Sequence, residues 1–128
     1  NILDTRLYRC GVLEKLFNKG IEIHIRSVFL QGLFYLSKAN LNNHFKDVVP
    51  YLDKLRSISA KSELTIAELS LLWLASLKEV SKIIIGVDNV NQLRAHLETM
   101  EKNVASLVYE EALSIHYENE TILNPYNW

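Results

Sequence analysis

Two segments of the chain have the hydrophobic patterns of β-strands. In residues 21–26 isoleucines alternate with polar residues, so an extended strand places the isoleucines on one face and Glu22, His24 and Arg26 on the other. Residues 82–85 form a β-branched run without alternation, which is typical of a strand buried on both faces of a parallel sheet. We therefore expect two main parallel strands.

Four or five further segments have the apolar spacing of helices. They are residues 8–18, 45–59, 66–77, 88 or 89 to 100, and 106–117. Thr65 and Glu68 have the spacing of a capping box at the start of the third. Gly20 follows the first helix where a left-handed residue commonly ends one, and a strand comes directly after it. This order of helix, glycine and strand predicts an αβ unit.

Two segments show no regular period. Residues 27–43 contain Gly32 and end in polar residues, so we expect a long loop that leaves the C-terminal end of the first strand, a common place for binding sites. Residues 121–128 are irregular but apolar, and we expect this tail to pack on a surface.

The number of strands is too small for a closed sheet. A parallel strand needs a neighbour on each edge and cover on both faces, which two strands and four to five helices do not supply. We expect residues 1–128 to be one fragment of an α/β protein. Its sheet is completed either by strands elsewhere in a parent sequence or by a second copy of the chain.

Composition narrows the possible partners. The 128 residues are 48% hydrophobic and 23% charged, with a net charge of −1 and no basic cluster, which excludes a nucleic-acid or anionic-membrane surface. No apolar run approaches the roughly 20 residues of a membrane span, and the first residues do not form a signal peptide. The single cysteine, Cys10, is compatible with a reducing cytoplasm.

The chemistry most clearly indicated by the sequence lies in residues 81–93. A buried strand runs through Gly86 into a helix cap, and such a junction presents backbone N–H groups to an anionic ligand. We therefore expect a cofactor-phosphate site. Gly86 has two interpretations, a tight strand-to-loop turn or a close approach of the phosphate.

Four motifs in order resemble the C-terminal part of an aldo/keto reductase. They are residues 1–6, residues 21–32, the helix after Thr65 with Leu71 and Trp73, and residues 83–86 followed by Gln92. The resemblance covers essentially the whole chain. It implies the C-terminal portion of a (β/α)8 TIM barrel, with the end of the sixth strand and the seventh and eighth strands with their helices.

The resemblance also implies residues that bind the cofactor. In the seventh strand the family usually has Tyr-Ser-Pro-Leu, and this chain has Arg26, Ser27, Val28 and Phe29 there. The family tyrosine stacks on the nicotinamide, and a guanidinium such as that of Arg26 can also stack on a flat ring. The loop that follows wraps the pyrophosphate. Ser27 either contacts the cofactor or bonds the local backbone.

After the eighth strand the resemblance implies contacts from Gly86, Val87, Asp88, Gln92 and His96. Asp88 stands where the family binds the 2′-phosphate of NADP, and its negative charge opposes that phosphate. The cofactor is thus NAD or NADP, with Asp88 favouring NAD. An exposed helix face is the other interpretation of Gln92 and His96.

The family's catalytic Asp, Tyr, Lys and His come from earlier strands that this chain lacks, so we assign no catalytic residue. We expect His24 to be packed and hydrogen-bonded inside the barrel. The histidines share no spacing that predicts a metal site.

Two functions follow from these patterns. The first is part of a cytoplasmic NAD(P)-dependent oxidoreductase that acts on a small-molecule carbonyl substrate; the chain forms the adenosine and pyrophosphate wall and is inactive alone. The second is a non-catalytic module that binds a nucleotide or a protein and self-associates through exposed sheet edges. Arg26 and Asp88 favour the second, whereas Ser27, Gly86 and Gln92 favour the first.

Overall fold

A pair of short parallel strands forms the sheet of the computed structural model, which describes residues 1–128. In this pair β1 (His24–Ile25) lies beside β2 (Lys82–Ile83), with His24 opposite Lys82 and Ile25 opposite Ile83. The amides of Ser81 and Ile84 extend the ladder to the carbonyls of Ile23 and Ile25, at 2.9 and 2.8 Å. The predicted parallel pair is confirmed.

Helices make up most of the remaining structure. The α-helices are α1 (Arg6–Arg9), α2 (Val12–Asn18), α3 (Val49–Ala60), α4 (Ile66–Ser76), α5 (Val90–Met100), α6 (Ser106–Leu113) and α7 (Glu120–Leu123). Short 3-10 turns are η1 (Leu33–Tyr35), η2 (Lys38–Asn40), η3 (Asn43–Val48) and η4 (Pro125–Asn127).

Three predicted segments differ from the structure in detail. The first helix is broken into α1 and α2 because Gly11 adopts a left-handed φ of 70°. The second helix opens with the 3-10 turn η3 before α3 begins. Residues 27–43 connect the strand to the helices as expected, but Leu30, Leu33 and Phe34 bury their side chains, so this connection is packed on the core.

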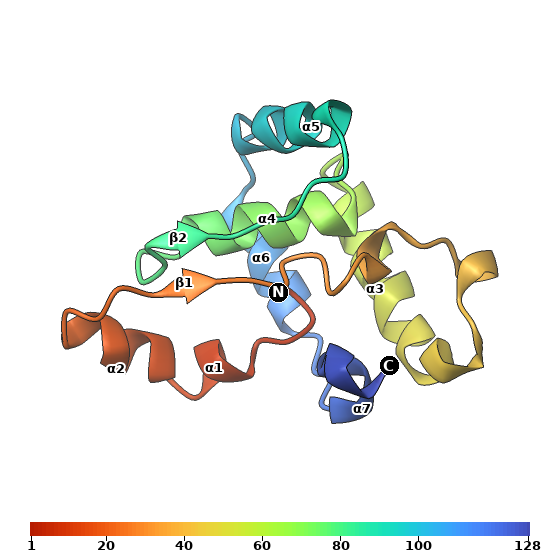
Figure 1. Cartoon of the computed structure of the whole chain (residues 1–128), viewed down its shortest axis with the longest axis horizontal. Helices are drawn as coiled ribbons and strands as arrows, with labels where there is room; N and C mark the ends of the chain where they lie inside the picture. Colours follow the sequence, from red (N-terminus) through yellow and green to blue (C-terminus); the bar gives the residue numbers. More distant parts are fainter.

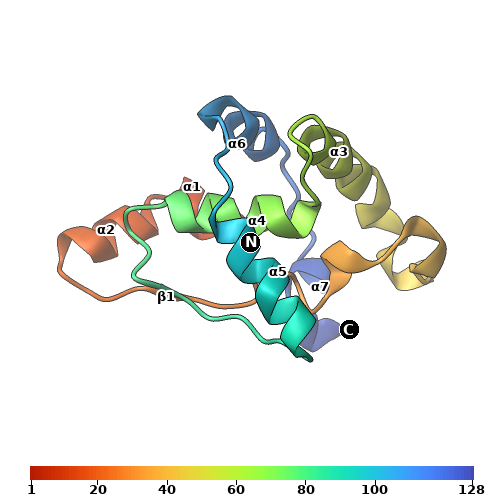
Figure 2. The same ribbon diagram turned by 90° about the horizontal axis from the view of Figure 1, so that it is seen from above.

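Helix α4 is the centre of the core. Seen from above, α4 lies between the strand pair and the two helices α3 and α6 (Figure 2). Its apolar side chains are buried almost all round, as the sequence predicts. The capping box is present: the Thr65 hydroxyl accepts from the Glu68 N–H at 3.2 Å, and the Glu68 carboxylate accepts from the Thr65 N–H at 2.8 Å.

The tail packs on the domain as expected, but most of it is folded into α7 and η4 and is not irregular. Ile122 and Leu123 of α7 are buried. The Trp128 indole N–H donates to the Ile122 carbonyl at 3.0 Å, and its ring meets Phe45 edge-on at 4.8 Å between centroids. No helix in the chain is both long and apolar enough to cross a membrane.

One face of the sheet is open, and here a prediction was wrong. Ile83 and Ile85 pack against the core, but Lys82 is exposed and Ile84 is 55% exposed. The strand is therefore not buried on both faces, because every helix that covers the sheet lies on one side of it (Figure 2). In a closed barrel the inner face of each strand is covered by side chains of the other strands. Two strands of such a barrel without the others therefore have one open face.

His24 lies on this open face, so the expectation of a packed histidine was also wrong. Its side chain is exposed, and Nε2 lies 2.9 Å from Glu22 Oε1. Lys82 Nζ approaches the same oxygen at 3.0 Å. Hydrogen bonds from His24 and Lys82 lower the pKa of Glu22 below its usual value. The polar line of β1 is thus an exposed network of charges.

Candidate functional site

The segments that follow β1 and β2 leave the sheet at the same edge. Because the strands are parallel and in register, Arg26 and Ile84 both emerge from this edge, towards the loops at the right of the strand pair in Figure 1. In α/β sheets this carboxyl edge is where ligands bind. All the predicted cofactor residues lie on these two loops or on α5.

The loop after β1 is a strained turn that is held by a hydrogen bond from the core helix α4. Ser27, Leu30 and Gln31 have positive φ values of 59°, 46° and 51°, which side-chain-bearing residues seldom adopt. Val28 is buried, and its carbonyl accepts a hydrogen bond from the hydroxyl of buried Ser70 at 2.9 Å. Packing from α4 thus holds a turn in which Val28 and Leu30 are buried while Arg26 and Ser27 are exposed.

Ser70 is a positioning residue that the sequence interpretation missed. Its hydroxyl donates to Val28 of the β1 loop and accepts from the Ile2 N–H at 3.1 Å. It therefore joins three chain segments inside the core. The signal was present, because Ser70 is a hydroxyl that stands between Leu69 and Leu71 in a mostly apolar stretch of the helix.

Arg26 and Ser27 are exposed at the mouth of this loop. The Arg26 guanidinium makes no ion pair or hydrogen bond within the chain, so its flat face and its donors are free. The Ser27 hydroxyl is also without an internal partner, whereas its carbonyl accepts from the Leu30 amide at 3.1 Å. Neither side chain contributes to holding the turn.

The loop after β2 is closed by its own side chains. Asn89 caps α5 by accepting from the Gln92 N–H at 3.0 Å. The Gln92 side-chain oxygen accepts from the Asp88 amide at 2.7 Å, and its NH₂ donates to the Asp88 carboxylate at 3.2 Å. Of the two predicted caps, Asn89 is therefore the one used, and the Gln92 amide pins Asp88 in place.

Gly86 and Val87 lie at the exposed start of this loop. Gly86 does not have a positive φ, and a Cβ added to it would meet no atom of the chain within 4 Å. The tight-turn interpretation is thus not supported, because neither the backbone nor the packing requires a glycine here. The free space beside Gly86 leaves its backbone accessible to a ligand.

Aromatic rings join the two loops. The imidazole of His96 on α5 stacks on Phe29 with centroids 4.8 Å apart and planes 16° apart, and Tyr35 lies 5.3 Å from the same Phe29 ring. Burial and the charge of Glu68 raise the pKa of Tyr35 to about 12, so its phenol is neutral at pH 7. Of the predicted cofactor residues, the structure therefore brings Phe29 into contact with His96 and Asp88 into contact with Gln92. Tyr35, which packs on Phe29, was not predicted as a site residue.

The histidines and acidic residues do not cluster into a metal site. No group of three or more His, Cys, Asp or Glu side chains in the chain is arranged to hold a metal ion. The chemistry offered by the carboxyl edge is a free guanidinium, a serine hydroxyl, a flat aromatic stack and an accessible glycine backbone. These groups suit a ligand with flat rings and an anionic linker.

Comparison with known proteins gives a consistent result. The sequence model of the Aldo/keto reductase family matches residues 1–114. The fold is similar to the crystal structure of a thermostable aldo-keto reductase, Tm1743, in complex with the inhibitor epalrestat, with a TM-score of 0.66 and 24% sequence identity. That match covers 89% of this chain and 36% of the reductase chain. No curated protein matches the chain.

Proposed function

This chain belongs to the aldo/keto reductase family, and from that premise we propose that it forms the cofactor wall of an NAD(P)-dependent reductase of aldehydes or ketones. Its two parallel strands and helices match part of a (β/α)8 barrel. The chain spans 36% of the solved reductase. The complete reaction is therefore assigned to a larger barrel, to which this chain contributes one side.

The observation that supports the proposal most is the meeting of two loops at the carboxyl edge. The stacked rings of Phe29 and His96 bring together the segments that follow β1 and β2. Barrel enzymes bind substrates and cofactors at this edge. Two loops held at a fixed separation can support the two halves of a dinucleotide.

The residues present fit such a cofactor. Gly86 lets the pyrophosphate approach the backbone, because no atom of the chain fills the space beside it. The Phe29 and His96 rings offer a stacking surface to the adenine, and Val87, the residue after Gly86, is exposed. Arg26 and Ser27 are free to contact the nicotinamide side. When bound, the nicotinamide supplies or accepts the hydride.

The charge of Asp88 sets the expected choice of cofactor. Its carboxylate is exposed and is held by the Gln92 side chain at 3.2 Å. A carboxylate in this position can accept a hydrogen bond from a ribose hydroxyl but repels a 2′-phosphate. We therefore assign a preference for NAD over NADP.

Proton transfer is assigned to residues outside this chain. His24, the histidine on the open face, is paired with Glu22 and lies on a strand rather than at the carboxyl edge. The chain alone is thus expected to bind the cofactor weakly and to turn over no carbonyl compound. The second candidate function, a non-catalytic nucleotide-binding module, is favoured by Arg26 and Asp88, which depart from the usual family residues.

A titration tests the proposal. Backbone amide NMR shifts of the ¹⁵N-labelled chain are followed while NAD⁺ is added. The expected result is a saturable shift at residues 26–29 and 86–96, with Lys15 and its neighbours on α2 unchanged. Shifts that do not saturate, or that do not include both loops, would overturn the cofactor-wall proposal. Measurable NADH oxidation by the purified chain with any aldehyde or ketone would overturn the assignment of catalysis elsewhere.

A further inference from the structure

A cavity lies on the side of α4 that faces away from the strands (Figure 2). It is formed between α3 and the C-terminal end of α6, and its volume is about 430 Å³. Tyr51, Lys54 and Ile58 line it from α3, and Ile115 and His116 line it from the segment after α6. A cavity of this size accommodates a small organic molecule. All its walls belong to this chain, and none of them is part of the carboxyl edge.

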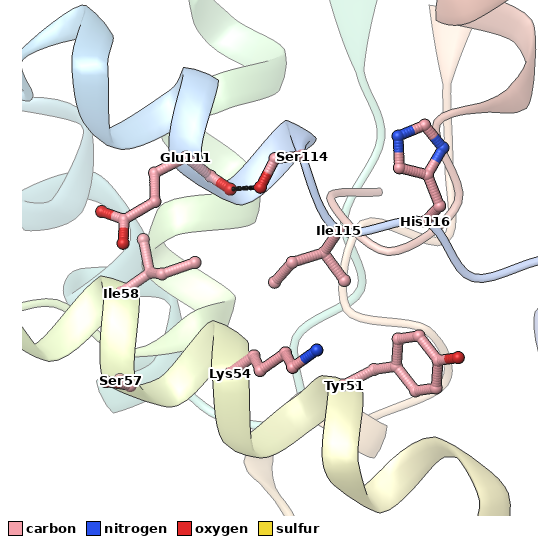
Figure 3. A pocket seen from close by; sticks show the side chains of 8 residues that line it. All are labelled: Tyr51, Lys54, Ser57, Ile58, Glu111, Ser114, Ile115 and His116. Carbon is pink, nitrogen blue, oxygen red and sulfur yellow. Dashed lines mark hydrogen bonds between the residues drawn. The ribbon is translucent and has the colours of Figure 1, made fainter.

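The polar groups of the cavity carry an excess of positive charge. Lys54 has no ion-pair partner in the chain, and Figure 3 shows its ammonium group projecting towards the space below Ile115. Glu111 is the only acid in the wall. Its carboxylate is already neutralised by Lys61 Nζ at 2.6 Å. The charge that remains unpaired is therefore the ammonium of Lys54.

Two further groups in the wall are suited to donate hydrogen bonds. The Ser57 hydroxyl has no partner in the chain. His116 Nε2 lies 3.0 Å from Arg9 Nη1. Because a guanidinium can only donate, Nε2 must accept, and in the neutral ring the proton then lies on Nδ1. The hydrogen bond from Arg9 therefore leaves Nδ1 of His116 as a hydrogen-bond donor.

Arg9 also fixes the backbone of this wall. Its Nη2 donates to the carbonyl of Leu113, so the guanidinium caps the C-terminal end of α6. Such a cation offsets the partial negative charge of the helix end, which would otherwise repel an anion. Arg9 thus holds this wall in place and reduces the negative potential that an anion in the cavity would meet.

We propose that this cavity binds a small organic anion. The acidic head group pairs with Lys54 and accepts hydrogen bonds from Ser57, and the apolar body lies against Ile58 and Ile115. The ring of Tyr51, with Lys54 Nζ 6.0 Å from its centroid, closes the adjacent side. The site is separate from the proposed cofactor wall and does not depend on it.

Benzoate and its neutral isostere benzamide are suitable probes. Each is added to the ¹⁵N-labelled chain while the amide shifts of residues 51–58 and 111–116 are recorded. The expected result is a saturable shift with benzoate that weakens as salt is added, and about fivefold weaker binding of benzamide, because an accessible charge pair contributes about 1 kcal/mol.

Matched variants assign the charge to one residue. Lys54→Met keeps the apolar stem and is expected to weaken benzoate binding about fivefold, while leaving benzamide binding unchanged. Lys15→Met, an unpaired exposed lysine on α2, is expected to change neither. The amide spectrum of each variant also reports whether it is folded. The proposal would be overturned if benzoate did not bind saturably or bound no better than benzamide. It would also be overturned if Lys54→Met and Lys15→Met changed benzoate binding equally.

Discussion

His96 stacks on Phe29, with ring centroids 4.8 Å apart and planes inclined by 16°. This contact joins α5 to the loop after β1, two parts of the chain that the backbone pairing of the strands does not connect directly. It therefore fixes the separation of the two loops proposed to hold the cofactor.

A double-mutant cycle measures this connection. Phe29→Ala and His96→Ala are each expected to destabilise the chain, and the coupling between them should be about 1 kcal/mol, the usual value for a stacked aromatic pair. Urea denaturation gives the free energies. Phe29→Ala combined with His44→Ala is the control, because His44 packs on Phe45 instead. A zero coupling for Phe29 and His96 would show that the stack does not join the loops.

Asp88 should control the choice between the two nicotinamide cofactors. Asp88→Asn retains the size of the side chain and removes the charge, so the affinity for NADP⁺ relative to NAD⁺ should rise about tenfold. Glu101→Gln removes an exposed acid at the far end of α5 and should leave the ratio unchanged. Titrations with both cofactors provide the ratio, and a ratio insensitive to Asp88→Asn would contradict the assigned role.

The open sheet and α5 should cause the isolated chain to self-associate. Both strands have a free edge, and the apolar stripe of α5 is uncovered, with Leu97 61% exposed. Leu97→Lys is expected to weaken association, whereas Leu107→Lys on α6, at a residue that is 71% exposed, should not. Sedimentation at several concentrations distinguishes these results. A compact monomer at all concentrations would contradict this prediction.

The elements with local chemical signals could be predicted from the sequence. Thr65 and Glu68 form the expected capping box, and Gly20 adopts the left-handed φ of 71° that ends α2. Both depend on residues only a few positions apart. The parallel pairing of β1 and β2 followed from the αβ order of the chain.

Other features could not be predicted because they depend on distant residues or on absent ones. Periodicity does not show that Phe29 meets His96, since their contact is set by how α5 packs. The break at Gly11 requires knowledge of its φ, because the helical spacing continues on both sides. The pattern of residues 82–85 indicates a strand covered on both faces, and this chain covers only one of them.

The loop at Gly86 is the centre of the proposed cofactor wall, and one variant tests this role most directly. In Gly86→Ala the added Cβ meets no atom of the chain within 4 Å, so the free energy of unfolding should be unchanged or slightly higher. The same methyl group stands where the pyrophosphate would approach, and NAD⁺ affinity should fall about tenfold, a difference of about 1.4 kcal/mol. NAD⁺ titration and urea unfolding of the two proteins provide the measurement. Unchanged NAD⁺ affinity in a folded Gly86→Ala chain would contradict the account.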